Sequence, residues 1–319
     1  MFQKYKYVLT VYEERSFTKA AKRLFISQPS LSVAIRNLEK EIGMPLFERS
    51  GSEIKPTEAG AAYISAAQKM LMADNEFQRK MAEINGLQTG KLVVGGSNYL
   101  SSDVLPRIIS RFRSRFPGVE ITLTEANSVT LRKMLCQEEV DIVIDNFGAF
   151  PDQYEAFPLT EEQVMLCVPA ERPVNNALKA YQITPQCIYD TASVSESVAP
   201  VDITAFKDEP FVLLKSGNDM HHRAMGMFED SGIMPNVVFR VDQLNISCAL
   251  AESGLGACFV TDTFFKYRKH MADVVLYKLK HHLAHRTLHV VYKKDRYCTR
   301  AMGEFIGITQ KMIGTGDQE

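Results

Sequence analysis

The stretch from Glu58 to Asn85 constrains this chain most, because it contains no proline and one glycine, which lies in its first turn. At 1.5 Å per residue, a helix over this stretch is about 42 Å long, far longer than an average helix. Before it, apolar residues repeat at helical spacing. After residue 90, short apolar runs alternate with helical patterns. The sequence therefore predicts a small helical domain, a long helix and a larger α/β domain.

The first 56 residues predict three short helices with tight connections. The apolar residues of the first helix step by three and four, at Phe2, Tyr5, Leu9 and Tyr12. A second and a third helix each follow a serine that can cap the first turn, Ser16 and Ser27. The third helix has an apolar stripe and a glycine suited to the left-handed end of a helix: Leu31, Ile35, Leu38, Ile42 and Gly43.

The opposite face of this third helix is small, hydroxylated and basic. Small residues let the backbone approach a nucleic acid, and a helix N-terminus attracts phosphate. Gln, Ser and Arg side chains reach base edges in a major groove, and two short helices with a tight turn form a helix-turn-helix. Double-stranded DNA is the expected partner, although a solvated helix face has the same pattern. The candidate contacts are Gln28, Pro29, Ser30, Ser32, Val33 and Arg36.

The segment that follows, "PLFERSGSEIKPTEAG", predicts a hairpin beside the helix-turn-helix. Its two arms carry Arg49 and Lys55, which we expect to contact sugar-phosphate. Residues 1–56 hold ten Lys and Arg against six Asp and Glu, whereas the remainder holds 27 against 32. The basic end of the chain is therefore the end that favours an anionic partner.

Apolar residues in the long helix step by four and three, which is a heptad seam with one polar position, Asp74. A seam that one chain cannot cover favours a partner helix, so we expect a homodimer. Packing onto the chain's own body is the alternative. The seam residues are Tyr63, Ala67, Met70, Phe77, Met81 and Ile84.

Beyond residue 90, about eight β-rich runs alternate with helical patterns. This alternation is typical of a mostly parallel sheet covered by helices. Over some 210 residues it fits two subdomains with a cleft between them.

Other motifs point to no cofactor, metal or enzyme activity. The sequence shows no phosphate-binding loop, no G-x-S-x-G and no H-E-x-x-H, and four histidines at 281–289 lack a flanking set of ligands. The six cysteines are scattered without a C-x-x-C motif, no signal peptide is visible and no apolar run has the ~20 residues of a membrane span. We expect a cytoplasmic protein without a membrane partner.

The N-terminal region resembles that of LysR-type transcriptional regulators. The matching residues are A-A-x-x-L, S-Q-P-S-L-S, I-R-x-L-E, G-x-x-L-F-x-R and T-x-A-G, and "VLPRIISRFRSRFPGVEITLTE" and "ALAESGLGACFV" extend the resemblance along the chain. It implies a winged helix-turn-helix, a dimerising linker helix and a two-subdomain fold like type 2 periplasmic binding proteins. It also implies homotetramers. Val33 and Ala34 lie where many members carry Arg, Lys or Gln, which puts the base preference in doubt.

The resemblance divides the chain at 1–57 (DNA-binding domain), 58–90 (linker helix and hinge) and 91–319 (effector-binding domain). Subdomain I is expected at about 91–160 and 270–300, and subdomain II at about 161–269.

The resemblance also implies that a small effector binds between the subdomains. The loops that would meet it contain Ser97, Asn98, Asn127, Ser128, Lys215 and Ser216. Serine hydroxyls before a helix N-terminus suit an anion, so an organic anion, a carboxylate above all, is the expected effector, with Lys215 supplying charge.

The sequence therefore predicts a DNA-binding transcriptional regulator switched by a small molecule. The alternatives are a redox-responsive regulator that uses its cysteines, a solute-binding protein, and an enzyme on the α/β domain.

Overall fold

The computed structural model describes residues 2–48, 54–84, 90–146, 152–191, 194, 197–267 and 273–314. The chain forms two compact units, Met1–Met81 and Ala82–Glu319. Each unit has a hydrophobic core of its own. Within the described ranges, no helix combines the length and the apolar character needed to cross a membrane.

The helices of the N-terminal unit begin and end where local signals place them. Ser16 Oγ accepts a hydrogen bond from the Lys19 amide, and Ser27 Oγ accepts one from the Ser30 amide. Gly43 ends the third helix with a φ of 81°, the left-handed value that favours glycine. The elements are α1 (Phe2–Glu14), α2 (Phe17–Arg23), α3 (Gln28–Ile42), β1 (Phe47–Glu48), β2 (Lys55–Pro56) and α4 (Glu58–Ile84).

The core of this unit differs from the predicted faces at two positions. Tyr12 is 41% exposed and Ile42 is 39% exposed, so neither belongs to the buried stripe. The side chains that α1 buries are Val8, Leu9 and Val11, whereas α3 buries Leu31, Ile35 and Leu38 as expected.

The start of α4 is fixed against the chain that precedes it. Thr57 Oγ1 accepts a hydrogen bond from the Gly60 amide and donates one to the Pro45 carbonyl. A Cβ atom on Gly60 would lie 1.9 Å from the Leu46 carbonyl oxygen, so only glycine fits at this close approach.

A sheet path of eight strands organises the C-terminal unit, in the order β4-β3-β5-β11-β6-β9-β7-β8, and β10 pairs with β6. The pairs β3–β4, β3–β5, β7–β8 and β7–β9 are parallel, whereas β6, β10 and β11 pair antiparallel. The strands are β3 (Gly90–Gly96), β4 (Val119–Glu125), β5 (Ile142–Asp145), β6 (Tyr154–Pro169), β7 (Pro210–Leu214), β8 (Asn236–Val241), β9 (Ala257–Thr261), β10 (Val274–Lys278) and β11 (His285–Lys293).

The long strand β6 divides this unit into two lobes. Its first part pairs with β11, in a first lobe with β3, β4 and β5. Its second part pairs with β9 and β10, in a second lobe with β7 and β8. The expected return to subdomain I at about residue 270 was wrong, because Val274–Lys278 pairs with β6 in the second lobe. The chain returns to the first lobe at β11 instead.

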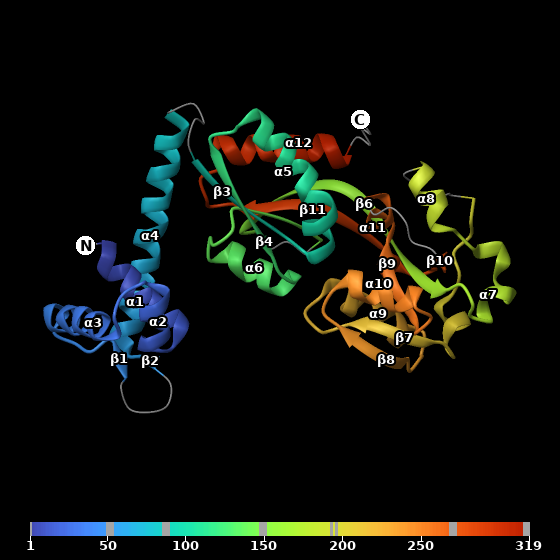
Figure 1. Cartoon of the computed structure of the whole chain (residues 1–319), viewed down its shortest axis with the longest axis horizontal. Coiled ribbons are helices and arrows are strands. Elements are labelled where there is room, and N and C mark those ends of the chain that lie inside the picture. Colours follow the sequence, from blue (N-terminus) through green and yellow to red (C-terminus); the bar gives the residue numbers. More distant parts are fainter. Residues whose placement is uncertain are drawn as a thin grey trace. The chain divides into compact units, whose positions relative to one another are not determined.

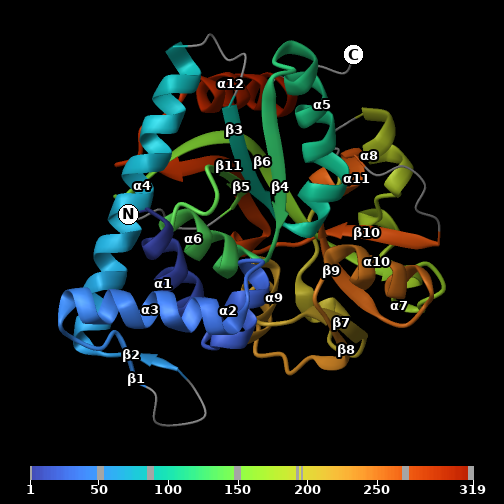
Figure 2. The ribbon, with the colours of Figure 1, turned by 60° about the vertical axis from the view of Figure 1, so that its left-hand side comes forward.

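Helices cover both faces of the first lobe's sheet. In Figures 1 and 2, α5 and α12 lie side by side over one face, and α6 lies on the other. Alternate residues of β5 confirm this, since Ile142 and Ile144 join the main core while Val143 joins the cluster beneath α6. The helices are η1 (Leu100–Val104), α5 (Leu105–Arg115), α6 (Ser128–Cys136), α7 (Val174–Ala177), η2 (Lys179–Tyr181), α8 (Pro185–Thr191), η3 (Ile203–Phe206), α9 (Asp219–Asp230), α10 (Leu244–Glu252), α11 (Asp262–Tyr267), η4 (His282–Ala284) and α12 (Arg300–Gly314).

Candidate DNA-binding surface and effector pocket

The outer face of α3 carries the side chains that the sequence assigns to DNA. Gln28 Nε2 donates a hydrogen bond to Ser32 Oγ at 2.9 Å, and the Ser27 and Ser30 hydroxyls lie 2.7 Å apart. Arg36 follows Ser32 by one turn, on the same face and opposite the buried stripe. Of the predicted contacts on this helix, Ser32 is half-buried and the others are exposed: Gln28, Pro29, Ser30, Val33 and Arg36.

The hairpin beside α3 has the expected antiparallel arms, with Glu48 opposite Lys55. Lys55 is exposed on β2, and Arg49 lies outside the described residues. Phe25 was not predicted as a surface residue, yet it is 96% exposed in the turn before α3 and has a φ of 56°. A bulky residue with positive φ is unusual, but no local pattern in the sequence marked it.

The predicted seam on α4 changes character along the helix. Ala67 is fully buried in the core of the N-terminal unit, and Tyr63 packs on Tyr5 with ring centroids 5.5 Å apart. Ala67 therefore serves the chain's own core, and Tyr63 is partly buried against it, which corrects the first part of the seam. The later positions that the structure describes expose apolar side chains: Met70 at 43%, Phe77 at 57% and Met81 at 46%. The side chain of Ile84 lies outside the described part.

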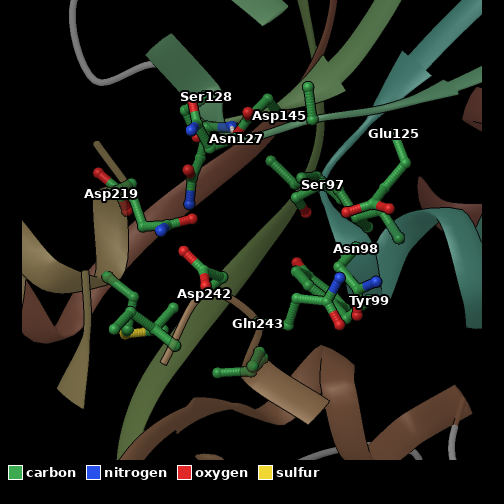
Figure 3. A pocket seen from close by; sticks show the side chains of 18 of the residues that line it. Ser97, Asn98, Tyr99, Glu125, Asn127, Ser128, Asp145, Asp219, Asp242 and Gln243 are labelled. Carbon is green, nitrogen blue, oxygen red and sulfur yellow. Dashed lines mark hydrogen bonds between the residues drawn. The ribbon is translucent and has the colours of Figure 1, made fainter. Parts of the chain in front are cut away.

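A pocket lies at the carboxyl ends of β3, β4, β5, β7 and β8, where α/β sheets bind ligands. It encloses about 600 Å³, including the part open to solvent. Figure 3 shows Asn127, Ser128 and Asp145 gathered on one side and Ser97, Asn98 and Tyr99 on another, with Asp219 and Asp242 nearby. The predicted residues that line it are Ser97, Asn98, Asn127 and Ser128.

The other two predicted residues, Lys215 and Ser216, are not part of the lining that the described residues form. Lys215 Nζ lies 2.7 Å from Asp242 Oδ2, and both side chains are more than half exposed. Strand β7 ends at Leu214, and Lys215 and Ser216 lie in the loop that follows it. The chain returns to the pocket where this loop ends and α9 begins. Asn218 and Asp219 therefore line the pocket where Lys215 and Ser216 were predicted to line it.

The carboxyl group of Asp145, at the end of β5, is the most buried acid in the pocket lining. It is 4% exposed, and its Oδ1 accepts a hydrogen bond from the Asn146 amide at 2.6 Å. Its Oδ2 has no hydrogen-bond partner among the described residues. Burial raises the pKa of Asp145 to about 6, against the opposing effect of hydrogen bonds from Asn146 and Ser128 and of the Arg286 charge.

A buried ion-pair network reaches the pocket through three of its lining residues, Tyr99, Asp219 and Arg286. Arg286 on β11 donates from Nε to Glu162 Oε2 at 2.7 Å and from Nη1 to Asp219 Oδ2 at 2.8 Å. The hydroxyl of Tyr99 donates to Glu162 Oε1 at 2.8 Å. Burial by itself would lower the pKa of Arg286, but Glu162, Tyr99 and Asp219 raise it above its ordinary value. The network therefore joins β6, the strand that runs through both lobes, to the start of α9 in the second lobe.

Three cysteines that are far apart in the sequence meet in the second lobe. Cys167 on β6 is the cross-strand partner of Cys258 on β9, and Cys248 lies on α10. Their sulfur atoms all lie within 4.8 Å of one another, and all three residues are buried. Burial raises the pKa of the Cys248 thiol above its ordinary value. Sequence spacing did not reveal this cluster, because a helix and two strands form it.

The four histidines at 281–289 do not all meet at one place. His281 Nε2 lies 3.1 Å from Asp230 Oδ2, and His282 is close to both. His285 and His289 do not join this group in the described part of the chain.

A winged helix-turn-helix followed by a two-lobed α/β unit with a pocket at its strand ends defines a DNA-binding regulator that carries a ligand-binding domain. Residues 2–61 match the family described as "Bacterial regulatory helix-turn-helix protein, lysR family", and residues 85–313 match "LysR substrate binding domain". The chain belongs to the LysR family of bacterial regulatory proteins. The predicted family, fold class and role in transcription regulation are confirmed, and the matches point to a regulator rather than to an enzyme.

Similar proteins extend over most of the chain. An uncharacterized HTH-type transcriptional regulator of Bacillus subtilis (strain 168), YcgK, is 28% identical over 97% of this chain and 93% of its own. A probable RuBisCO transcriptional regulator of Synechocystis sp. (strain ATCC 27184 / PCC 6803 / Kazusa) is 26% identical over 92% and 81%.

Solved structures show the same fold. Full-length CbnR complexed with its target DNA has a TM-score of 0.62 at 20% identity, covering 98% of this chain and 99% of that one. Full-length BenM has a TM-score of 0.55 at 22% identity, covering 99% and 97%.

Proposed function

We propose that α3 enters the major groove of an operator and that the β1–β2 hairpin contacts the flanking backbone. The observation that carries this proposal is the exposed polar face of α3, which lies opposite its buried stripe. Val33, 51% exposed, offers methyl groups that suit a thymine methyl, and Arg36 suits guanine or phosphate. The proposed contacts are Gln28, Pro29, Ser30, Ser32, Val33 and Arg36 on α3, with Arg49 and Lys55 on the hairpin.

Arg36→Ala is expected to weaken operator binding about 5- to 150-fold, because a base or phosphate contact contributes on the order of 1–3 kcal/mol. The duplex is one that the purified chain selects from a random library, and a gel-shift titration measures the affinity. Lys69→Ala is the matched control, since it removes an exposed charge from α4, away from α3. Equal affinities for both variants would show that α3 does not face the DNA.

We also propose the division into a DNA-binding domain at 1–57, a linker helix and hinge at 58–90 and an effector-binding domain at 91–319. The exposed apolar residues Met70, Phe77 and Met81 support a homodimer through α4. Dimers would assemble into tetramers, and the regulator would act in the cytoplasm, where a bacterial chromosome lies.

The effector pocket is the second part of the proposal. A small molecule in the pocket would contact both lobes, so it can favour one arrangement of the lobes and change how the regulator binds DNA. The hydroxyl of Ser97 still supports a carboxylate on this molecule, whereas the hydroxyl of Ser128 donates to Asp145. Lys215 no longer supports it, because its ammonium group pairs with Asp242.

A redox-responsive regulator is the second candidate, because Cys167, Cys248 and Cys258 lie together. Their burial opposes it, because buried thiols are out of reach of an oxidant in solution. Burial also raises the pKa of Cys248, whereas hydrogen bonds with Cys167 and Cys248 lower the pKa of Cys258.

We therefore expect hydrogen peroxide to leave operator affinity unchanged while it oxidises exposed cysteines such as Cys136 first. Gel shifts and mass spectrometry of the treated protein measure both effects. A peroxide-induced change in affinity that disappears in Cys248→Ala would favour the redox candidate instead.

A further inference from the structure

One carboxylate oxygen of Asp145, Oδ2, is buried without a hydrogen-bond partner among the described residues. A buried carboxylate normally has partners on both oxygens, because an unpartnered charge in a low-dielectric site is costly. Here the Asn146 amide holds Oδ1, while Oδ2 is buried in the lining of the pocket without a partner among the described residues. We therefore expect a ligand in the pocket to supply the hydrogen-bond donor for Oδ2.

The charges around Asp145 determine what that partner is. The pocket lining contains three further carboxylates, Glu125, Asp219 and Asp242, and one cation, Arg286. The three nitrogens of Arg286 already donate within the network, to Glu162, Asp219 and the Tyr99 hydroxyl. Asp242 pairs with Lys215, and Asp219 pairs with both Arg286 and Arg223. Among the described residues, the carboxylates of the lining that have no cation partner are therefore Asp145 and the exposed Glu125, and Arg286 is the one arginine or lysine that lines the pocket.

We propose that the effector carries a protonated amino group and that this group donates a hydrogen bond to Oδ2 of Asp145. The inference rests on the proposed function of the pocket as the effector site. A charged N–H to carboxylate bond is stronger than one from a neutral donor, and an ammonium group compensates the buried charge as well as filling the open acceptor. A carboxylate elsewhere on the same molecule is compatible with the hydroxyl of Ser97.

The test uses n-butylammonium, butyrate and n-butanol as matched probes, because they share a four-carbon chain and differ in the polar group. Even at the ceiling of about 1.5 kcal/mol per heavy atom, ligands of so few atoms bind no tighter than about micromolar, so each probe is titrated over a wide range, to about 100 mM, at constant ionic strength. Thermal unfolding of the full chain at pH 7.5 measures binding as a rise in melting temperature. We expect butylammonium to raise the melting temperature and the other two to leave it unchanged.

Asp145→Asn keeps the shape of the side chain and removes its charge, so the butylammonium shift should disappear in this variant. Burial raises the pKa of Asp145 to about 6, which means that the folded protein disfavours the charged form present at pH 7.5. Without ligand, the neutral variant should therefore have a melting temperature equal to or higher than that of the parent. Asp208→Asn is the control, since it removes an exposed carboxylate outside the pocket lining and should keep the shift.

Acidic pH provides an independent readout. Butylammonium stays charged between pH 7.5 and pH 5, whereas Asp145 takes up a proton across this range, so the shift should fade on acidification. Glu125, Asp219, Asp242 and Arg286 also face the ligand, and Asp145→Asn separates their effect from that of Asp145.

The outcomes separate this inference from the function on which it rests. Butyrate or butanol binding as well as butylammonium, or a shift that survives in Asp145→Asn, would overturn the amine inference and leave the pocket as a ligand site. No shift with any probe would overturn the inference and count against the pocket as the effector site, while the Arg36 variant still tests DNA binding.

Discussion

Replacing Arg286 with alanine is expected to lower the free energy of unfolding of the C-terminal unit by about 3–5 kcal/mol, because it leaves a buried charge without its partner. Glu162 is 1% exposed and lies opposite Arg286 on the neighbouring strand. Without the guanidinium, its carboxylate retains the Tyr99 hydroxyl and loses the only cation that contacts it in the described structure. Asp219 would keep Arg223, whose Nε lies 2.6 Å away.

Urea unfolding of the full chain, followed by circular dichroism, measures the loss. Lys294→Ala provides the matched control, because it breaks the exposed Lys294–Glu155 pair, which contributes at most about 1 kcal/mol. Combining Arg286→Met with Glu162→Gln should recover part of the stability, since neither charge then remains buried. If Arg286→Ala costs as little as Lys294→Ala, the network does not stabilise the unit.

The features that the sequence predicted well depend on residues close together in the chain. Ser16 and Ser27 cap the starts of α2 and α3, and Gly43 ends α3. Each of these contacts involves residues a few positions apart, so the residue types and their spacing were sufficient to predict the helix boundaries. The buried stripe of α3 follows from helical period alone. Tyr12 and Ile42 show the limit of this reasoning, because the period places a residue on a face but does not show how far the neighbouring helices cover it.

The features that the sequence did not predict depend on distant segments. Arg286 and Glu162 are 124 residues apart and meet only because β11 pairs with β6 in one register. Strand β10 was placed in the wrong subdomain for the same reason, since its own residues do not specify their partner. Asp145 and Asp242 did carry a signal, because each directly ends or follows a strand whose carboxyl end faces the pocket.

Phe77→Asp is expected to dissociate the proposed dimer and to abolish tight operator binding. Phe77 is 57% exposed in the single chain, between Met70 and Met81 on the same stripe of α4. Such an apolar stripe is typical of a helix that packs against another. An aspartate at this position would place a charge in that contact, next to Asp74 and opposite its own copy. Burying such a charge without a partner should cost several kcal/mol.

Sedimentation measures the oligomer, and the selected duplex measures DNA affinity. Ser65→Asp is the control, since it adds the same charge at an exposed position of α4 outside the stripe. The two measurements should change together, because two linked recognition helices read a palindromic site far more tightly than one does. An unchanged oligomer would mean that other surfaces hold the chains together. A dissociated dimer with unchanged DNA affinity would instead mean that one DNA-binding domain is sufficient for operator recognition.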